Sequence, residues 1–110
     1  MPSIPERVAK GAALLDEKLP GWHDRIDLDQ LRLSSPCNCI LGQTWDGEVE
    51  HGDDPFFLHA NRLFGRESGV HVEAAHGFNS VHSGRAAREE FGELTAEWRR
   101  IILARRGGAQ

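Results

Sequence analysis

Both cysteines of the chain, Cys37 and Cys39, lie one residue apart, directly after Ser35 and Pro36. Serine is a common helix N-cap and proline a common first helical residue, so we expect a helix to begin at Ser35. The unpaired amides and the dipole of a helix N-terminus stabilise a thiolate, which would make Cys37 a nucleophile or a metal ligand. Zinc needs about four ligands, and His76 is a candidate beside the two cysteines.

On a helix, however, side chains two residues apart point about 200° away from each other. Cys37 and Cys39 could share a metal ion only where the chain is not yet helical. The favoured prediction is therefore that one or both thiols are small buried apolar groups, with Cys37 on the buried side of the helix. No cofactor is expected.

A cluster of carboxylates lies between positions 46 and 54, formed by Asp46, Glu48, Glu50, Asp53 and Asp54. A calcium-binding EF-hand loop requires glycine at its sixth position. Counted from Asp46, Gly52 stands seventh, so the spacing does not fit. We expect a solvated acidic loop in which Asp53 and Asp54 are candidates for contacts with a partner protein. Weak binding of a divalent ion is the alternative.

Phenylalanines dominate the helix that we expect after this loop. Asp54 and Pro55 have the residue types that open a helix. Phe56, Phe57 and Phe64 follow as apolar positions. An exposed apolar patch of several hundred Å² marks interaction surfaces, so these three residues are candidates for binding a partner.

A basic cluster stands near the end of the chain, formed by Arg99, Arg100, Arg105 and Arg106. Such a cluster can bind the phosphates of a nucleic acid, but cations also complement the dipole at a helix C-terminus. The chain as a whole carries a net charge of -4 at pH 7, which gives it no general attraction to nucleic acid. We therefore favour the helix-stabilising role, keep the four arginines as candidates for partner contacts, and rank nucleic-acid binding lower.

Apolar residues recur every three or four positions along much of the chain, which predicts amphipathic helices. We expect helices at about 4–19, 35–45, 55–64, 70–76 and 84–106. Ser3 and Glu6 fit a capping box at the start of the first helix. Gly77 suits a left-handed residue after the fourth, with Phe78 packing back on its last turn.

These elements predict an all-α fold, a compact single-domain bundle of about five helices over residues 1–110 with a long C-terminal helix. Trp22, Trp45 and Trp98 are expected to be largely buried, each with a partner for its indole N–H. Gly92 costs the last helix about 1 kcal/mol relative to alanine, so we expect a neighbouring helix to approach closely there.

The sequence lacks the short patterns of several common enzyme classes. It has no glycine-rich dinucleotide loop, no phosphate-loop lysine, no Gly-x-Ser-x-Gly and no His-Glu-x-x-His. No apolar run approaches the ~20 residues of a membrane span, and no secretory signal is visible. We predict a non-enzymatic cytoplasmic protein without a membrane partner.

Four stretches carry a family resemblance: GAALLDEKLPGW at 11–22, RIDLD at 25–29 running into LSSPCNCILGQ at 33–43, HGF at 76–78 and LTAEWR at 94–99. Through them the chain resembles a group of small uncharacterised proteins of actinobacteria and their bacteriophages. The resemblance spans about residues 8–105 and transfers no catalytic residue. It implies a phage or prophage accessory protein that acts on a host component.

The sequence therefore favours a non-enzymatic interaction module that binds a host or phage protein through a helix face or the acidic loop. The alternative is a small zinc- or nucleic-acid-binding accessory protein. That protein would use Cys37 and Cys39 with a histidine, or the terminal arginines.

Overall fold

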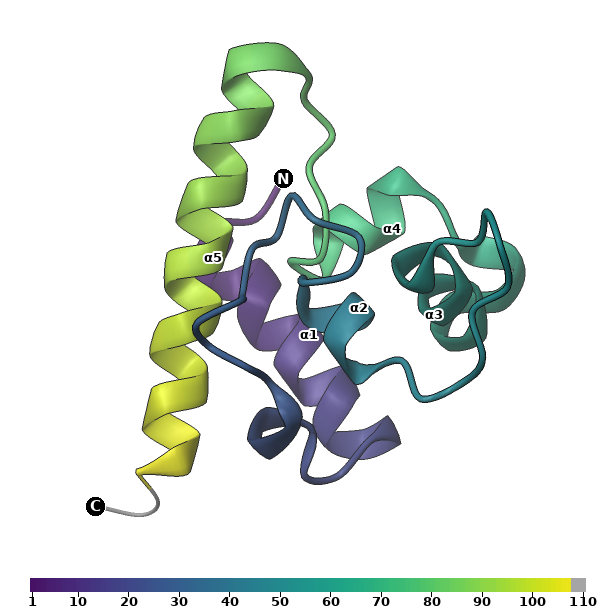
Figure 1. Ribbon diagram of the computed structural model, residues 1–110. Coiled ribbons are helices and arrows are strands. Elements are labelled where there is room, and N and C mark those ends of the chain that lie inside the picture. Colours follow the sequence, from purple (N-terminus) through teal and green to yellow (C-terminus); the bar gives the residue numbers. More distant parts are fainter. Residues whose placement is uncertain (108–110) are drawn as a thin grey trace.

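The computed structural model describes residues 1–107, and within them the chain forms helices and no strands. The α-helices are α1 (Ile4–Lys18), α2 (Ile40–Thr44), α3 (Pro55–Phe64), α4 (Val70–Ala75) and α5 (Gly84–Arg106). Two short 3-10 turns, Trp22–Arg25 and Gly65–Glu67, lie between them. In Figure 1, α5 runs the full height of one side, and the shorter elements lie on its other side. The all-α prediction and the long last helix are confirmed. Over residues 1–107, no helix combines the length and apolar character that a membrane crossing requires.

Local capping signals set the start of α1 as predicted. The Ser3 hydroxyl oxygen accepts from the Glu6 amide at 3.3 Å, and the Ser3 amide donates to the Glu6 carboxylate at 3.3 Å. The apolar stripe of the helix, Val8, Ala12 and Leu15, is fully buried. This stripe packs α1 against α4 and α5.

The centre of the core is a set of aromatic contacts around Trp98 of α5. Its ring stacks on Phe78 at 5.4 Å between centroids and meets Trp22 edge-on at 5.6 Å. The Trp98 indole N–H donates to the Gly77 carbonyl at 2.6 Å, and the Trp22 indole N–H donates to Asp16 at 2.8 Å. Both tryptophans are fully buried, as predicted. Trp45 is partly buried, and its indole N–H donates to the Glu48 carbonyl at 3.4 Å.

The end of α4 is a Schellman motif, in agreement with the prediction for Gly77 and Phe78. Gly77 has a φ of 72°, its amide donates to the Ala74 carbonyl, and the Phe78 amide donates to the Glu73 carbonyl. The motif turns Phe78 back into the core beneath Trp98.

The prediction of a close helix approach at Gly92 is wrong. A Cβ placed on Gly92 would meet no atom within 4 Å, whereas one on Gly11 would lie 2.0 Å from the His76 carbonyl oxygen. The close approach therefore occurs between α1 and the end of α4. Gly92 instead leaves open space on α5.

The predicted helix start at Ser35 is also wrong, because α2 begins only at Ile40. Ser35 opens a turn instead, in which its hydroxyl oxygen accepts from the Asn38 amide at 3.2 Å. The N-cap of α2 is Cys39, whose sulfur accepts from the Gly42 amide at 3.3 Å. The Pro36 carbonyl folds back against Gly42, where a Cβ would lie 2.2 Å away. This turn leaves Cys37 exposed, which corrects its expected place on the buried side.

Candidate functional site

The four terminal arginines are engaged within the protein and do not form a free basic patch. Arg99 donates to the Leu28 carbonyl at 2.6 Å, and Arg106 donates to the carbonyls of Ile26 and His23. Arg100 pairs with Glu97 at 2.5 Å and Arg105 with Asp16 at 3.0 Å. Arg99 and Arg106 hold the segment 23–28 against α5, Arg105 holds the end of α1 there, and the Arg100 pair lies within α5 itself.

The three candidate phenylalanines do not form one exposed patch, which corrects that prediction. Phe57 is 59% exposed, but Phe56 and Phe64 are half-buried and pack against the core. Phe64 also contacts the ring of His76 at 4.9 Å.

The acidic loop (residues 46–54) is solvent-exposed over most of its length, as predicted. Asp53 is exposed, and Asp54 is the N-cap of α3, accepting from the Phe57 amide at 3.1 Å. Asp46 pairs with Arg62 at 2.9 Å, and this hydrogen bond lowers the pKa of its carboxyl. Asp54 thus has a local structural role and is not a free contact residue.

Cys37, Cys39 and His76, the weaker metal alternative, are not brought together. Burial raises the pKa of the Cys39 thiol to about 11, which disfavours the thiolate that a metal needs. The Nδ1–H of His76 donates to the Val72 carbonyl at 2.8 Å. No group of three or more His, Cys, Asp or Glu side chains suited to a metal ion occurs in residues 1–107.

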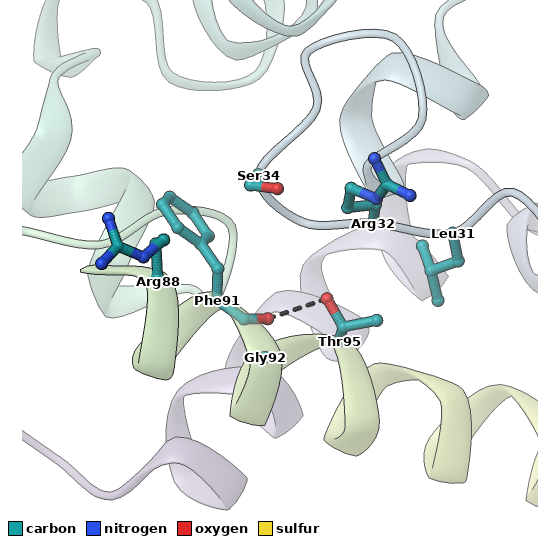
Figure 2. Close-up of a pocket in the computed structure, with 7 residues that line it drawn as sticks. All are labelled: Leu31, Arg32, Ser34, Arg88, Phe91, Gly92 and Thr95. Atoms are coloured by element: carbon teal, nitrogen blue, oxygen red, sulfur yellow. Dashed lines mark hydrogen bonds between the residues drawn. The ribbon is translucent and has the colours of Figure 1, made fainter. Parts of the chain in front are cut away.

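A groove that sequence reasoning missed lies between the segment 31–34 and α5 (Figure 2). It has a volume of about 430 Å³. Its lining residues are Leu31, Arg32, Ser34, Arg88, Phe91, Gly92 and Thr95. We call this the arginine groove. In Figure 2, Arg32 and Arg88 stand on opposite sides of it, with Phe91 and Ser34 between them.

One wall of the arginine groove is the segment 31–34, which ends in a turn closed by the Ser35 amide and the Arg32 carbonyl at 3.0 Å. Leu31 and Leu33 are buried, whereas Arg32 and Ser34 are exposed. The segment is fixed to α5 by a hydrogen bond from the Leu33 amide to the Thr95 hydroxyl oxygen at 3.0 Å. It therefore presents Arg32 and Ser34 from a fixed backbone.

The other wall is one face of α5. Arg88, Phe91, Gly92 and Thr95 are spaced three, four and seven residues apart, which places them on the same side of a helix. Gly92 has no side chain to fill the floor, and the Thr95 hydroxyl donates back to the Phe91 carbonyl at 2.8 Å (Figure 2). The floor is thus open and mainly apolar.

The two arginines of the groove are free to bind a ligand. Within residues 1–107, neither Arg32 nor Arg88 has a hydrogen-bond or ion-pair partner for its side chain. Most other arginines do have one, namely Arg7, Arg25, Arg62, Arg99, Arg100, Arg105 and Arg106. No carboxylate lines the groove, so its local charge is positive in a chain of net charge -4. Planar guanidinium groups with unused donors suit a carboxylate or phosphate.

A comparison of the chain with protein-family models, curated proteins and solved structures finds no match. The candidate site therefore depends on geometry and charge alone.

Proposed function

We propose that the protein is a non-enzymatic interaction module that binds an acidic segment of a partner protein in the arginine groove. The observation that carries this proposal is the pair of unpartnered guanidinium groups, Arg32 and Arg88, on either side of an apolar floor. Carboxylates of the partner pair with these groups while its apolar side chains cover Leu31 and Phe91. Complementary charge of this kind fixes the orientation of a partner and speeds its association.

A short acidic peptide fits the groove better than a nucleic acid does. Typical protein–DNA complexes neutralise about 6–10 phosphates, whereas two arginines line this groove. The net charge of -4 would repel an extended polyanion beyond the groove. A short segment meets only the local positive charge.

The lining residues also favour binding over catalysis. They include no histidine, carboxylate or thiol, and so offer no general base for the hydroxyl of Ser34. With the resemblance to proteins of actinobacteria and their phages, this supports an accessory protein whose partner is a host or phage protein of the bacterial cytoplasm.

The test is a fluorescence-anisotropy titration with a labelled Glu-Glu-Leu-Glu-Glu peptide. Each exposed ion pair contributes about 0.2–1 kcal/mol, so the Arg32→Gln/Arg88→Gln double variant should bind about 2- to 30-fold more weakly. The control is Lys10→Gln/Arg66→Gln, which removes the same charge at exposed positions outside the groove and should bind as the wild type does.

Two outcomes would contradict the proposal. One is equal weakening in both double variants, which would indicate a general charge effect. The other is tighter binding of a single-stranded oligonucleotide than of the peptide, lost in the groove variant, which would indicate a nucleic-acid site.

A further inference from the structure

A second, smaller hollow adjoins the arginine groove and shares two of its residues, Ser34 and Phe91. Its volume is about 160 Å³. Its lining residues are Leu33, Ser34, Ser35, Pro36, Cys39, Asp54, Phe56, Phe78, Asn79 and Phe91. We call it the aromatic hollow, because three phenylalanines from three parts of the chain meet there.

The polar groups around the aromatic hollow are largely occupied by other partners. Asp54 accepts from the Phe57 amide, and the Ser35 hydroxyl oxygen accepts from the Asn38 amide. The Asn79 side chain donates to Glu73 and accepts from the Ser80 amide. A ligand that enters the hollow therefore finds mostly apolar contacts. An apolar cavity of about 150 Å³ is large enough to take benzene, so the hollow matches one aromatic ring in size.

Two of the rings that line the hollow have unused surface. Phe56 and Phe91 are half-buried, and neither has an aromatic partner within residues 1–107. Phe78, in contrast, already stacks on Trp98. An added ring would pair with Phe56 and Phe91 by edge or offset contacts.

We propose that the aromatic hollow takes a Phe or Tyr side chain of the same acidic segment that occupies the arginine groove. This inference rests on the proposed function and specifies the partner further, as a segment with an aromatic residue next to its carboxylates. The charged residues around the two sites determine the orientation of the bound segment. Asp54 lines the hollow and repels a carboxylate, whereas Arg32 and Arg88 attract one in the groove. The aromatic end therefore lies toward α3 and the acidic end toward Arg32.

The experiment compares peptides that differ only in the ring. Glu-Glu-Gly-Phe and Glu-Glu-Gly-Gly-Phe, both with an amidated C-terminus so that no carboxylate lies beside the ring, are titrated beside the same amidated peptides with Ala in place of Phe. Burial of most of one phenylalanine should make the better Phe peptide bind about tenfold more tightly than its Ala counterpart. Phe56→Ala should abolish this advantage, while Phe57→Ala, on the same helix but outside the hollow, should keep it.

Phe56 also packs against the core, so Phe56→Ala could lose binding through unfolding alone. A second variant, Ser34→Phe, avoids this problem because Ser34 is exposed. Its added ring fills the place where the arginine groove meets the aromatic hollow. It should also remove the advantage of the Phe peptide. Equal affinity of the Phe and Ala peptides would overturn the inference and leave the arginine groove intact. Loss of binding by every peptide would instead contradict the proposed function. Tighter binding of 3-phenylpropanoate than of the Phe peptides would overturn the assignment to a peptide in favour of a small aromatic anion.

Discussion

Replacement of Trp98 by alanine tests whether the aromatic cluster around α5 holds the fold together. Trp98 is fully buried, stacks on Phe78, meets Trp22 edge-on and donates to the Gly77 carbonyl. It thus joins α5, the end of α4 and the turn after α1.

The expected loss in the free energy of unfolding has two contributions. Truncation of a buried large aromatic residue to alanine costs about 3–5 kcal/mol. Loss of its hydrogen bond leaves the Gly77 carbonyl without a partner, which places Trp98→Ala toward the upper end, about 4–5 kcal/mol. A domain of this size has a total stability of about 5–15 kcal/mol. The thermal midpoint should fall by about 15–20 °C.

Urea unfolding followed by far-UV circular dichroism measures this loss without relying on tryptophan fluorescence. Trp98→Phe serves as the comparison, because it keeps a ring for Phe78 and removes only the indole N–H and part of the volume. The free energy of unfolding of Trp98→Phe should be about 1–3 kcal/mol lower than that of the wild type. A Trp98→Ala protein within about 1 kcal/mol of the wild type would refute the central packing role of this residue.

Three further predictions concern local features of the structure. Gly11→Ala should destabilise the protein, because the added Cβ would lie 2.0 Å from the His76 carbonyl oxygen. Gly92→Ala should stabilise α5 by about 0.5–1 kcal/mol, because its Cβ would meet no atom within 4 Å. Urea unfolding measures the stability of both variants. Burial lowers the pKa of His59 below its usual range, so protonation near pH 6.5 favours the unfolded chain. Stability should therefore fall as the pH drops from 7.5 to 5.5, and a His59→Asn protein that shows the same fall would contradict this cause. Iodoacetamide at pH 8 should modify exposed Cys37 and spare buried Cys39, whose pKa is about 11. Mass spectrometry should then show one adduct in the folded protein and two in urea, and two adducts in buffer would disprove the burial of Cys39.

Sequence reasoning succeeded where a feature depends on residues close together in the chain. The capping box of Ser3 and Glu6, the N-cap at Asp54 and the left-handed Gly77 each involve neighbours within a few positions. Their signals are therefore visible in the sequence. The apolar spacing of α5 likewise predicted that Trp98 is buried.

Prediction from the sequence failed where the partner of a residue lies in a distant part of the chain. For Arg99 and Arg106 the sequence favoured complementing the helix dipole and left partner contacts open, but it did not reveal that carbonyls of the segment 23–28 accept their hydrogen bonds. Gly92 suggested a close helix contact, which occurs instead at Gly11. In each case the residue type was informative, but its partner depended on the tertiary fold.

The arginine groove shows the same limit. Arg32 and Arg88 belong to different elements, and nothing in their local sequence indicates that they face one groove. The available signals were the alternating Leu-Arg-Leu-Ser run at 31–34 and the glycine on the same helix face as Arg88. Neither signal predicts a groove by itself, because the groove forms only when the hydrogen bond from the Leu33 amide to Thr95 fixes the segment against α5.

The most direct test of the arginine groove as a binding site is a map of where an acidic peptide binds. Uniformly ¹⁵N-labelled protein is titrated with Glu-Glu-Leu-Glu-Glu while the backbone amide shifts are followed by NMR. Binding in the arginine groove predicts that the largest shift changes occur at Arg32 and Ser34 and on α5 from Arg88 to Thr95, and that high salt reduces these changes. Changes confined to other surfaces, or none at millimolar peptide, would contradict it.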